Sequence, residues 1–200
     1  MRTLRNIPIL ALAFALLAQG SARAQSVSGK EGQNLYSQSS IRARGRGRKL
    51  VLVSRGKSHL LDVSESTDAA KLDDVSVLFE TRRADFTYLL VAACGPSKLK
   101  SDDRQCGAGM ECNLLWLKLT SGWQIGEIKS VRYESCWSPI TSTDGYQISG
   151  NTLRMEYSDF RKMMSYKLTY DAAQPEKGFQ VEESPLPATR VPSSGLTGAF

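Results

Sequence analysis

Phe86-Thr-Tyr-Leu-Leu-Val-Ala-Ala-Cys94 opens the segment that decides the fold of this chain, residues 86–137. The stretch is apolar on both faces, which is typical of a central strand that is covered on both sides. A second strong strand follows at Leu114-Leu-Trp-Leu-Lys-Leu119. Its Leu115, Leu117 and Leu119 share one face, and its Leu114, Trp116 and Lys118 share the other. We expect these two strands to form the centre of the fold.

Short strands with turn signals between them continue outward from this centre in both directions. Residues 50–53 and 58–63 are expected to form a hairpin in which Gly56 supplies a positive φ. Residues 145–157 are expected to form a second hairpin that turns at Gly150-Asn151. Further strands are expected at 75–79, 122–128, 131–135, 164–170 and 179–181. This series of about ten short strands predicts an all-β fold, an antiparallel meander that forms either a sandwich or an open barrel.

The four cysteines are expected to stabilise this fold as disulfides. Cys94, Cys106, Cys112 and Cys136 contain no C-x2-C pair, so the usual signature of a zinc site is missing. We favour a Cys94–Cys112 bridge between neighbouring strand ends, which leaves Cys106 for Cys136. The alternative, Cys94–Cys106 with Cys112–Cys136, stays open. Each bridge is expected to stabilise the fold by about 2–4 kcal/mol.

The N-terminus is typical of a bacterial secretory signal. Two arginines precede an apolar run over residues 7–17, and Ala22-Arg-Ala24 fits the cleavage rule. The run is too short for a permanent membrane anchor. We therefore expect residues 1–24 to be removed and the protein to be periplasmic or secreted. The remaining 176 residues suit a single β domain over residues 49–183, and their formal net charge falls from +6 to +3.

Both flanks of this domain are expected to be flexible. Residues 25–48 have almost no apolar content, and residues 184–200 form a loose Pro- and Ser-containing tail. The leader ends in a run of five cations in eight residues. One interpretation is that this run contacts an anionic envelope polymer; the other is that it is a solvated linker. These cations are Arg42, Arg44, Arg46, Arg48 and Lys49.

The connection between the two central strands is the candidate binding site. It is long, polar and bounded by cysteines. Disulfides at these cysteines would restrict the loop before binding and so lower the entropic cost of ordering it on association. Its candidate contact residues are Lys98, Lys100, Asp102, Asp103, Arg104 and Met110. The alternative is a stapled loop without a partner.

No catalytic constellation stands out. The single histidine, His59, lies on an expected strand without a marked nucleophile, and no cofactor or metal site is expected. Trp123 and Trp137 are expected in the core rather than as ligand platforms. Carboxylates in or near strands keep a glycan hydrolase open as an alternative. They are Glu80, Asp85, Glu111, Glu127, Glu134 and Glu156.

The sequence therefore favours a non-enzymatic binding module of the bacterial envelope, an inhibitor or immunity-like factor for a protein partner. Nucleic acid is not an expected partner in that compartment, and the mature chain is not expected to span a membrane.

Overall fold

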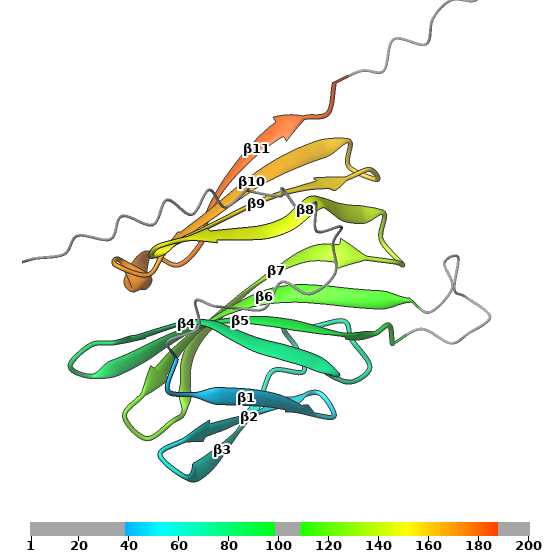
Figure 1. The fold of residues 1–200 in the computed structure, drawn as a ribbon. Helices are drawn as coiled ribbons and strands as arrows, with labels where there is room; N and C mark the ends of the chain where they lie inside the picture. The colour runs from blue at the N-terminus through cyan, green and yellow to red at the C-terminus, as the bar shows by residue number, and fades with distance from the viewer. Residues whose placement is uncertain (1–38, 99–108, 188–200) are drawn as a thin grey trace, which may run out of the picture. The chain divides into compact units, whose positions relative to one another are not determined.

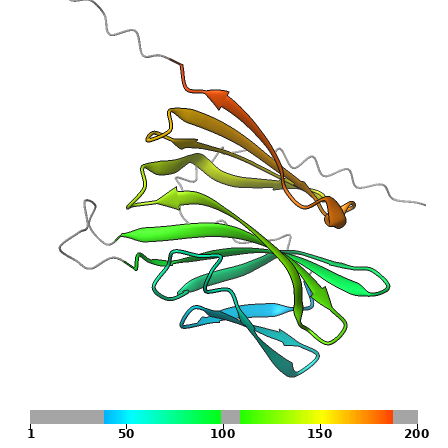
Figure 2. The ribbon, with the colours of Figure 1, turned by 180° about the vertical axis from the view of Figure 1, so that it is seen from behind.

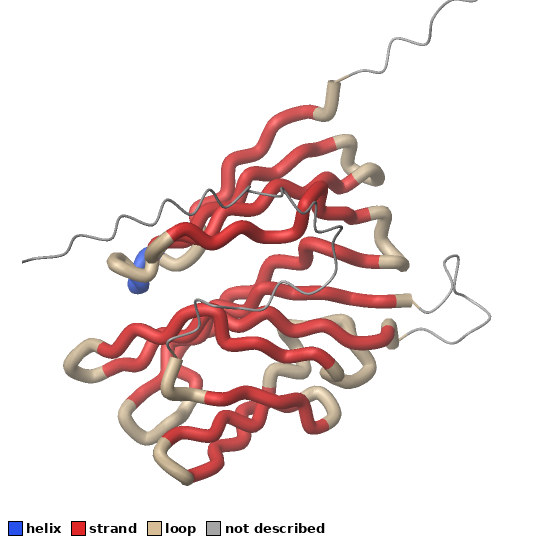
Figure 3. The backbone as a smooth tube through the Cα atoms, in the orientation of Figure 1, coloured by secondary structure: helices blue, strands red, loops and turns tan. Residues whose placement is uncertain are grey.

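A computed structural model describes residues 39–98 and 109–187, which belong to one compact unit whose regular secondary structure is almost entirely β-strand (Figure 1). The predicted all-β antiparallel meander is confirmed. The strands are β1 (Arg42–Arg46), β2 (Lys49–Ser54), β3 (Lys57–Asp62), β4 (Asp74–Arg82), β5 (Phe86–Pro96), β6 (Met110–Thr120), β7 (Ile125–Ser135), β8 (Ile140–Ser149), β9 (Thr152–Asp159), β10 (Met164–Asp171) and β11 (Gln180–Pro185). One 3-10 turn, η2 (Pro175–Lys177), is the only helical segment that Figure 3 marks among these residues. Within the described residues, no helix has the length and apolar character needed to cross a membrane.

The strands form two antiparallel sheets. β1, β2 and β3 make a three-stranded sheet, and β4 to β11 follow one another in an eight-stranded sheet whose edges are β4 and β11. This large sheet is nearly divided between β7 and β8, which share the single pairing Ser135↔Ile140. Figure 2 shows the strands of the second half, β8 to β11, diverging from β7 beyond that point.

The central pair β5 and β6 is covered on both faces, as predicted. On one face, Leu90, Leu114 and Trp116 belong to a first core that also contains side chains of β9 and β10. On the other face, Leu115, Leu117 and Leu119 belong to a second core shared with β2 and β3. All these leucines are less than 1% exposed. Successive side chains of β6 therefore point alternately into the first and the second core.

Tyrosines fill much of the first core. Tyr157 and Tyr166 stack at 4.8 Å between ring centroids, and Tyr133 meets Tyr146 edge-on at 6.4 Å. The indole N–H of Trp116 donates to the carbonyl of Pro175 at 2.8 Å, which ties the β10–β11 connection over this core.

The β3–β4 connection, residues 63–73, is pressed against both sheets. Its Leu72 N–H donates to the carbonyl of Gly47, and its Asp73 N–H donates to the carbonyl of Cys94. A Cβ added to Gly45 would meet the Leu72 carbonyl oxygen at 1.9 Å, and one added to Gly95 would meet the Lys71 carbonyl oxygen at 1.8 Å. Glycine is therefore required at both positions, because the two backbones approach too closely for a side chain.

The favoured Cys94–Cys112 bridge is confirmed. The two residues are direct cross-strand partners in β5 and β6, with their Cα atoms 4.2 Å apart. This bond rules out the alternative pairing of Cys94 with Cys106. Cys136 is also disulfide-bonded. Cys106 lies outside the described residues.

Two expectations about the flanks of the β domain are wrong where the structure describes them. Residues 42–46, expected in a flexible leader, form β1 and pair with β2 over their full length. They do so because Ala43 packs against the second core and Gly45 allows Leu72 to approach. The tail was expected from residue 184, but β11 continues to Pro185 by pairing with β10. The expected signal peptide, most of the leader and most of the tail lie outside the described residues.

The two predicted hairpins are present, and their turns use the expected glycines. Arg55 and Gly56 have φ values of 50° and 75°, and Gly150 has a φ of 56°. The strands expected at 122–128 and 131–135 form the single strand β7, which stays continuous against β6 by means of two register shifts.

Candidate functional site

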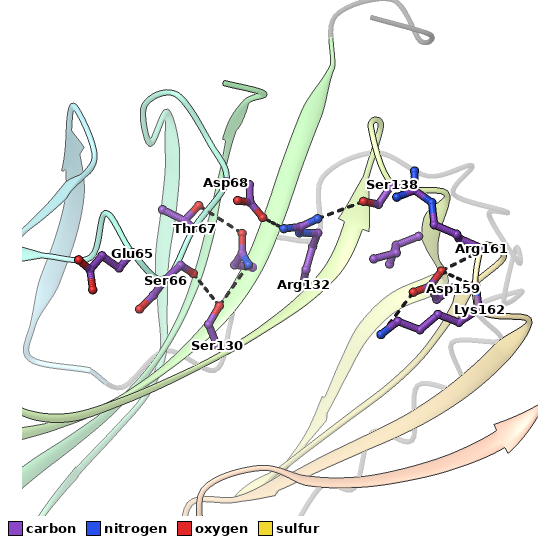
Figure 4. Close-up of a pocket in the computed structure, with 12 residues that line it drawn as sticks. Glu65, Ser66, Thr67, Asp68, Ser130, Arg132, Ser138, Asp159, Arg161 and Lys162 are labelled. Atoms are coloured by element: carbon purple, nitrogen blue, oxygen red, sulfur yellow. Dashed lines mark hydrogen bonds and ion pairs between the residues drawn. The ribbon is translucent and has the colours of Figure 1, made fainter. Parts of the chain in front are cut away.

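A polar cleft of about 440 Å³ lies between the β3–β4 connection and the turns that follow β7 and β9 (Figure 4). One wall is formed by residues 65–68, and the floor includes Asn113 of β6 together with Ser130 and Arg132 of β7. The opposite wall is formed by Ser138, Ile140, Asp159, Arg161 and Lys162. Ile140 is the only aliphatic side chain among these, so the cleft differs from the mostly apolar pockets typical of small-molecule sites.

Arg132 connects the two walls. Its guanidinium forms an ion pair with Asp68, and its Nη1 donates to the Ser138 hydroxyl at 3.2 Å. Burial lowers the pKa of Arg132, while the negative charge of Asp159 opposes that shift. Figure 4 shows the Arg132 side chain lying between Asp68 and Ser138. The position of this cation is therefore set by groups from two separate connections.

Hydrogen bonds hold the first wall on the floor. The Thr67 hydroxyl donates to Asn113 Oδ1 at 3.2 Å, and the Ser130 hydroxyl donates to the Ser66 carbonyl at 2.7 Å. Asn113 Nδ2 donates in turn to the Ser130 hydroxyl. Thr67 and Asn113 are both buried, so the wall is fixed before any ligand arrives.

The second wall is organised by Asp159, at the end of β9. Its Oδ1 accepts the backbone N–H groups of Arg161 and Lys162 at 3.0 and 3.1 Å, and its Oδ2 lies 3.8 Å from Lys162 Nζ. Asp159 is only 7% exposed, whereas Arg161 and Lys162 are exposed. Among the residues that the structure describes, the Arg161 guanidinium has no hydrogen bond or ion pair. The cleft thus presents a free cation beside a fixed carboxylate.

A buried carboxylate stands behind the cleft. Glu111 is 1% exposed, and neither of its carboxylate oxygens accepts a hydrogen bond from the residues that the structure describes. Arg132 Nε lies 3.8 Å from Glu111 Oε2 and has no hydrogen-bond acceptor within residues 39–98 and 109–187. Glu111 therefore relies on the Arg132 charge for its electrostatic compensation.

Exposed apolar residues lie on or near the segments that line this cleft. Trp137 precedes Ser138 in the β7–β8 turn, and Phe160 and Met163 flank Arg161 and Lys162 in the β9–β10 turn. Backbone hydrogen bonds join these segments: Cys136 N–H donates to the Met110 carbonyl, and Phe160 N–H donates to the Pro139 carbonyl. We name the four exposed residues Met110, Trp137, Phe160 and Met163 the apolar rim. They are 50%, 39%, 51% and 52% exposed.

The structure places only part of the predicted loop site. Lys98 Nζ donates to the Thr67 carbonyl at 2.7 Å and lies 3.9 Å from Asp68, so Lys98 supports the first wall of the cleft. Burial lowers the pKa of Lys98, and the nearby charge of Arg48 adds to that shift. Met110 belongs to the apolar rim. The other predicted contacts, Lys100, Asp102, Asp103 and Arg104, lie outside the described residues.

The two tryptophans differ from each other. Trp123 is half-buried against the second core and stacks on His59 with ring centroids 4.3 Å apart. This contact gives His59 a packing role on β3. The expectation that Trp137 lies in the core is wrong, because the β7–β8 turn projects it outward.

The carboxylates considered for glycan hydrolysis do not lie together at one site of the described structure. All four of Asp85, Glu127, Glu134 and Glu156 are exposed: Asp85 lies in the β4–β5 turn, Glu127 and Glu134 lie seven residues apart in β7, and Glu156 lies in β9. Neither of the two pockets described is lined by two of the six candidates. Glu80 is engaged by Ser39, Ser40 and Arg82. Within residues 39–98 and 109–187, no three His, Cys, Asp or Glu side chains form a group that could hold a metal ion.

The sequence analysis missed Arg132, Asp159 and the apolar rim beyond Met110. A signal was available in Asp159-Phe-Arg-Lys-Met163, which places two large apolar residues beside two cations where a turn is expected. Such residues are unlike the usual small polar turn residues. Arg132 carried no comparable signal, because its partners come from distant parts of the chain.

Comparison of the chain with protein-family models, curated proteins and solved structures finds no match, so the interpretation of this site depends on its own geometry.

Proposed function

We propose that this protein is an exported, non-enzymatic binding module that takes a protein partner on the surface formed by the cleft and the apolar rim. One observation carries this proposal. Of the six exposed large hydrophobic side chains in the described residues, three lie on the two turns that form one wall of the mixed-charge cleft, and a fourth, Met110, begins β6, the strand whose Asn113 lies in its floor.

The residue types of this surface support a protein partner over a small molecule. Aromatic residues, methionine and arginine are enriched at the centres of protein interfaces. The rim supplies Trp137, Phe160 and two methionines, and the cleft supplies Arg161 with no competing partner among the described residues. The polar lining of the cleft suits the charged side chains of another protein better than a drug-sized apolar ligand.

The surface is held in place before binding. The Cys94–Cys112 bridge joins the ends of β5 and β6 close to Met110, and Lys98, Asp68 and Arg132 form a chain of contacts along the first wall and the floor of the cleft. Such preorganisation lowers the ordering cost of association, as expected of an inhibitor or immunity-like factor. The disulfide also supports an oxidising location, in the periplasm or outside the cell after cleavage near Ala24.

Site-specific photo-cross-linking in the native envelope tests this proposal. A photoreactive side chain placed at Phe160 should cross-link one protein, identified by mass spectrometry, while the same group at Lys167, an exposed position in β10, should not. With that partner purified, Phe160→Ala and Trp137→Ala should each weaken the dissociation constant at least ~10-fold. The matched control is Val181→Ala, which truncates an exposed apolar residue in β11. Equal capture from both positions, or an unchanged dissociation constant for both rim variants, would overturn the proposal.

A further inference from the structure

A second surface, independent of the cleft, lies on β1. Arg42, Arg44 and Arg46 alternate with Ala43 and Gly45, and this alternation places the three arginines on one face. All three are exposed, while Ala43 packs on the second core and Gly45 contacts Leu72. Residues two apart in a strand are separated by roughly 6.7 Å, so the three arginines start from one face of the backbone in a row about 13 Å long.

The charges of this row are not neutralised by neighbours. Within the described parts of the chain, no ion pair or side-chain hydrogen bond engages Arg42, Arg44 or Arg46. The other two cations of the segment are already used: Arg48 Nη2 donates to the Thr67 carbonyl at 3.3 Å, and Lys49 Nζ lies 3.6 Å from Asp62. Three of the five cations noted in the sequence are therefore available to a ligand.

The row is rigid. β1 pairs with β2 at every residue from Arg42↔Val53 to Arg46↔Lys49. The Leu72 N–H donates to the Gly47 carbonyl at 2.7 Å, which fixes the end of the strand on the β3–β4 connection. A ligand that matches this spacing would bind without ordering the backbone.

The positive charge is linear rather than spread over the sheet. The cross-strand neighbours of Arg42 and Arg44 in β2 are Val53 and Val51, and the next residues across, in β3, are Ser58 and Leu60. Arg46 has a cation, Lys49, as its neighbour in β2, and the next residue across in β3 is Asp62, which lies 3.6 Å from Lys49 Nζ and offsets its charge. A planar anionic lipid surface would be matched best by cations in two dimensions, whereas a single row matches one extended chain of anions.

We propose that the outer face of β1 binds a linear polyanion through Arg42, Arg44 and Arg46. Each guanidinium offers a planar fork of N–H donors to the oxygens of one anionic group along the polymer. The chain would lie along the strand, with successive contacts at the two-residue spacing. This surface is separate from the cleft in its residues and in its ligand.

Binding of the full-length oxidised protein to two linear probes, inorganic polyphosphate and polygalacturonate, tests the proposal. At least one probe should bind, with affinity that rises with chain length. If three phosphate groups of a flexible chain are contacted, the slope of log affinity against log salt concentration should be about −2. The triple variant Arg42→Gln, Arg44→Gln, Arg46→Gln should lose ~10-fold or more in affinity and most of that slope.

A matched variant controls for net charge. Arg154→Gln, Lys167→Gln, Lys177→Gln also removes three exposed cations, from β9, β10 and η2, and should keep most of the affinity. Thermal unfolding checks that both variants are folded. Equal losses in the two variants, affinity independent of chain length, or binding to anionic vesicles with no binding to either polymer would overturn the proposal. Because the rim residues are unchanged in both variants, cross-linking from Phe160 is not affected by this outcome.

Discussion

Arg132 of β7 forms an ion pair with Asp68 of the β3–β4 connection and also donates a hydrogen bond to Ser138 of the β7–β8 turn. One side chain thereby joins the two walls of the cleft. It does so beside the division of the large sheet, where Ser135↔Ile140 is the single pairing between β7 and β8.

Replacing Arg132 by glutamine is expected to destabilise the protein by about 1–3 kcal/mol, because it leaves the buried Glu111 carboxylate without its cation. Adding Glu111→Gln should restore part of this loss. The measurement is the free energy of unfolding in urea. Lys167→Gln, which breaks an exposed pair with Glu156 at 3.5 Å, is the control and should cost less than about 0.5 kcal/mol. A double variant no more stable than Arg132→Gln would show that Glu111 is not the cause.

Gly95→Ala is expected to destabilise the fold by about 1–3 kcal/mol, because the new methyl group would meet the Lys71 carbonyl oxygen at 1.8 Å. The β3–β4 connection must then move away from β5. Gly122→Ala is the matched control: its nearest atom lies at 3.8 Å, and we expect a change within about 0.5 kcal/mol. Urea unfolding of both variants is the measurement, and equal stability would contradict the close approach.

The double variant Cys94→Ala, Cys112→Ala is expected to lose about 3 kcal/mol of stability, since the bridge closes a sequence separation of 18 residues. The two residues are paired neighbours in β5 and β6, so the alanines leave the strand pairing itself intact. Urea unfolding under non-reducing conditions measures the loss. An unchanged free energy of unfolding would mean that the bridge does not restrict the unfolded chain.

Glu80 is expected to give the protein an acid-sensitive contribution to stability. Burial raises the pKa of the Glu80 carboxyl, but hydrogen bonds from Arg82, Ser39 and Ser40 outweigh burial, so that the pKa lies below its ordinary value of 4.5. A carboxyl with a lowered pKa stabilises the fold above its ordinary pKa, and this contribution is lost as the pH falls through the folded-state pKa.

Glu80→Gln should therefore cost about 1 kcal/mol near neutral pH, and this cost should shrink as the pH falls below 4.5. Urea unfolding across an acid pH series measures the difference between the two proteins. Asp85→Asn, at an exposed position directly before β5, is the control and should stay within about 0.5 kcal/mol. A cost that grows towards acid pH would contradict the sign of the shift.

The sequence by itself determined the class of fold and the identity of the central strands. The apolar run in β5 and the alternation in β6 are local patterns, and burial on both faces follows directly from them. The two hairpins were equally predictable, because Gly56 and Gly150 supply turn conformations that depend on neighbouring residues alone. The Cys94–Cys112 pairing followed from the same reasoning once its two strands were taken as neighbours.

Only the tertiary structure decided where the cleft lies and which cations are free. Arg132 meets Asp68 because the β3–β4 connection folds across β6 and β7, and no local pattern records that contact. Arg42, Arg44 and Arg46 look like a flexible charged run in the sequence, but a strand partner and the close approach of Leu72 to Gly45 order them into a row. Secondary structure here depends on short-range periodicity, whereas the two proposed binding surfaces depend on contacts between residues distant in the chain.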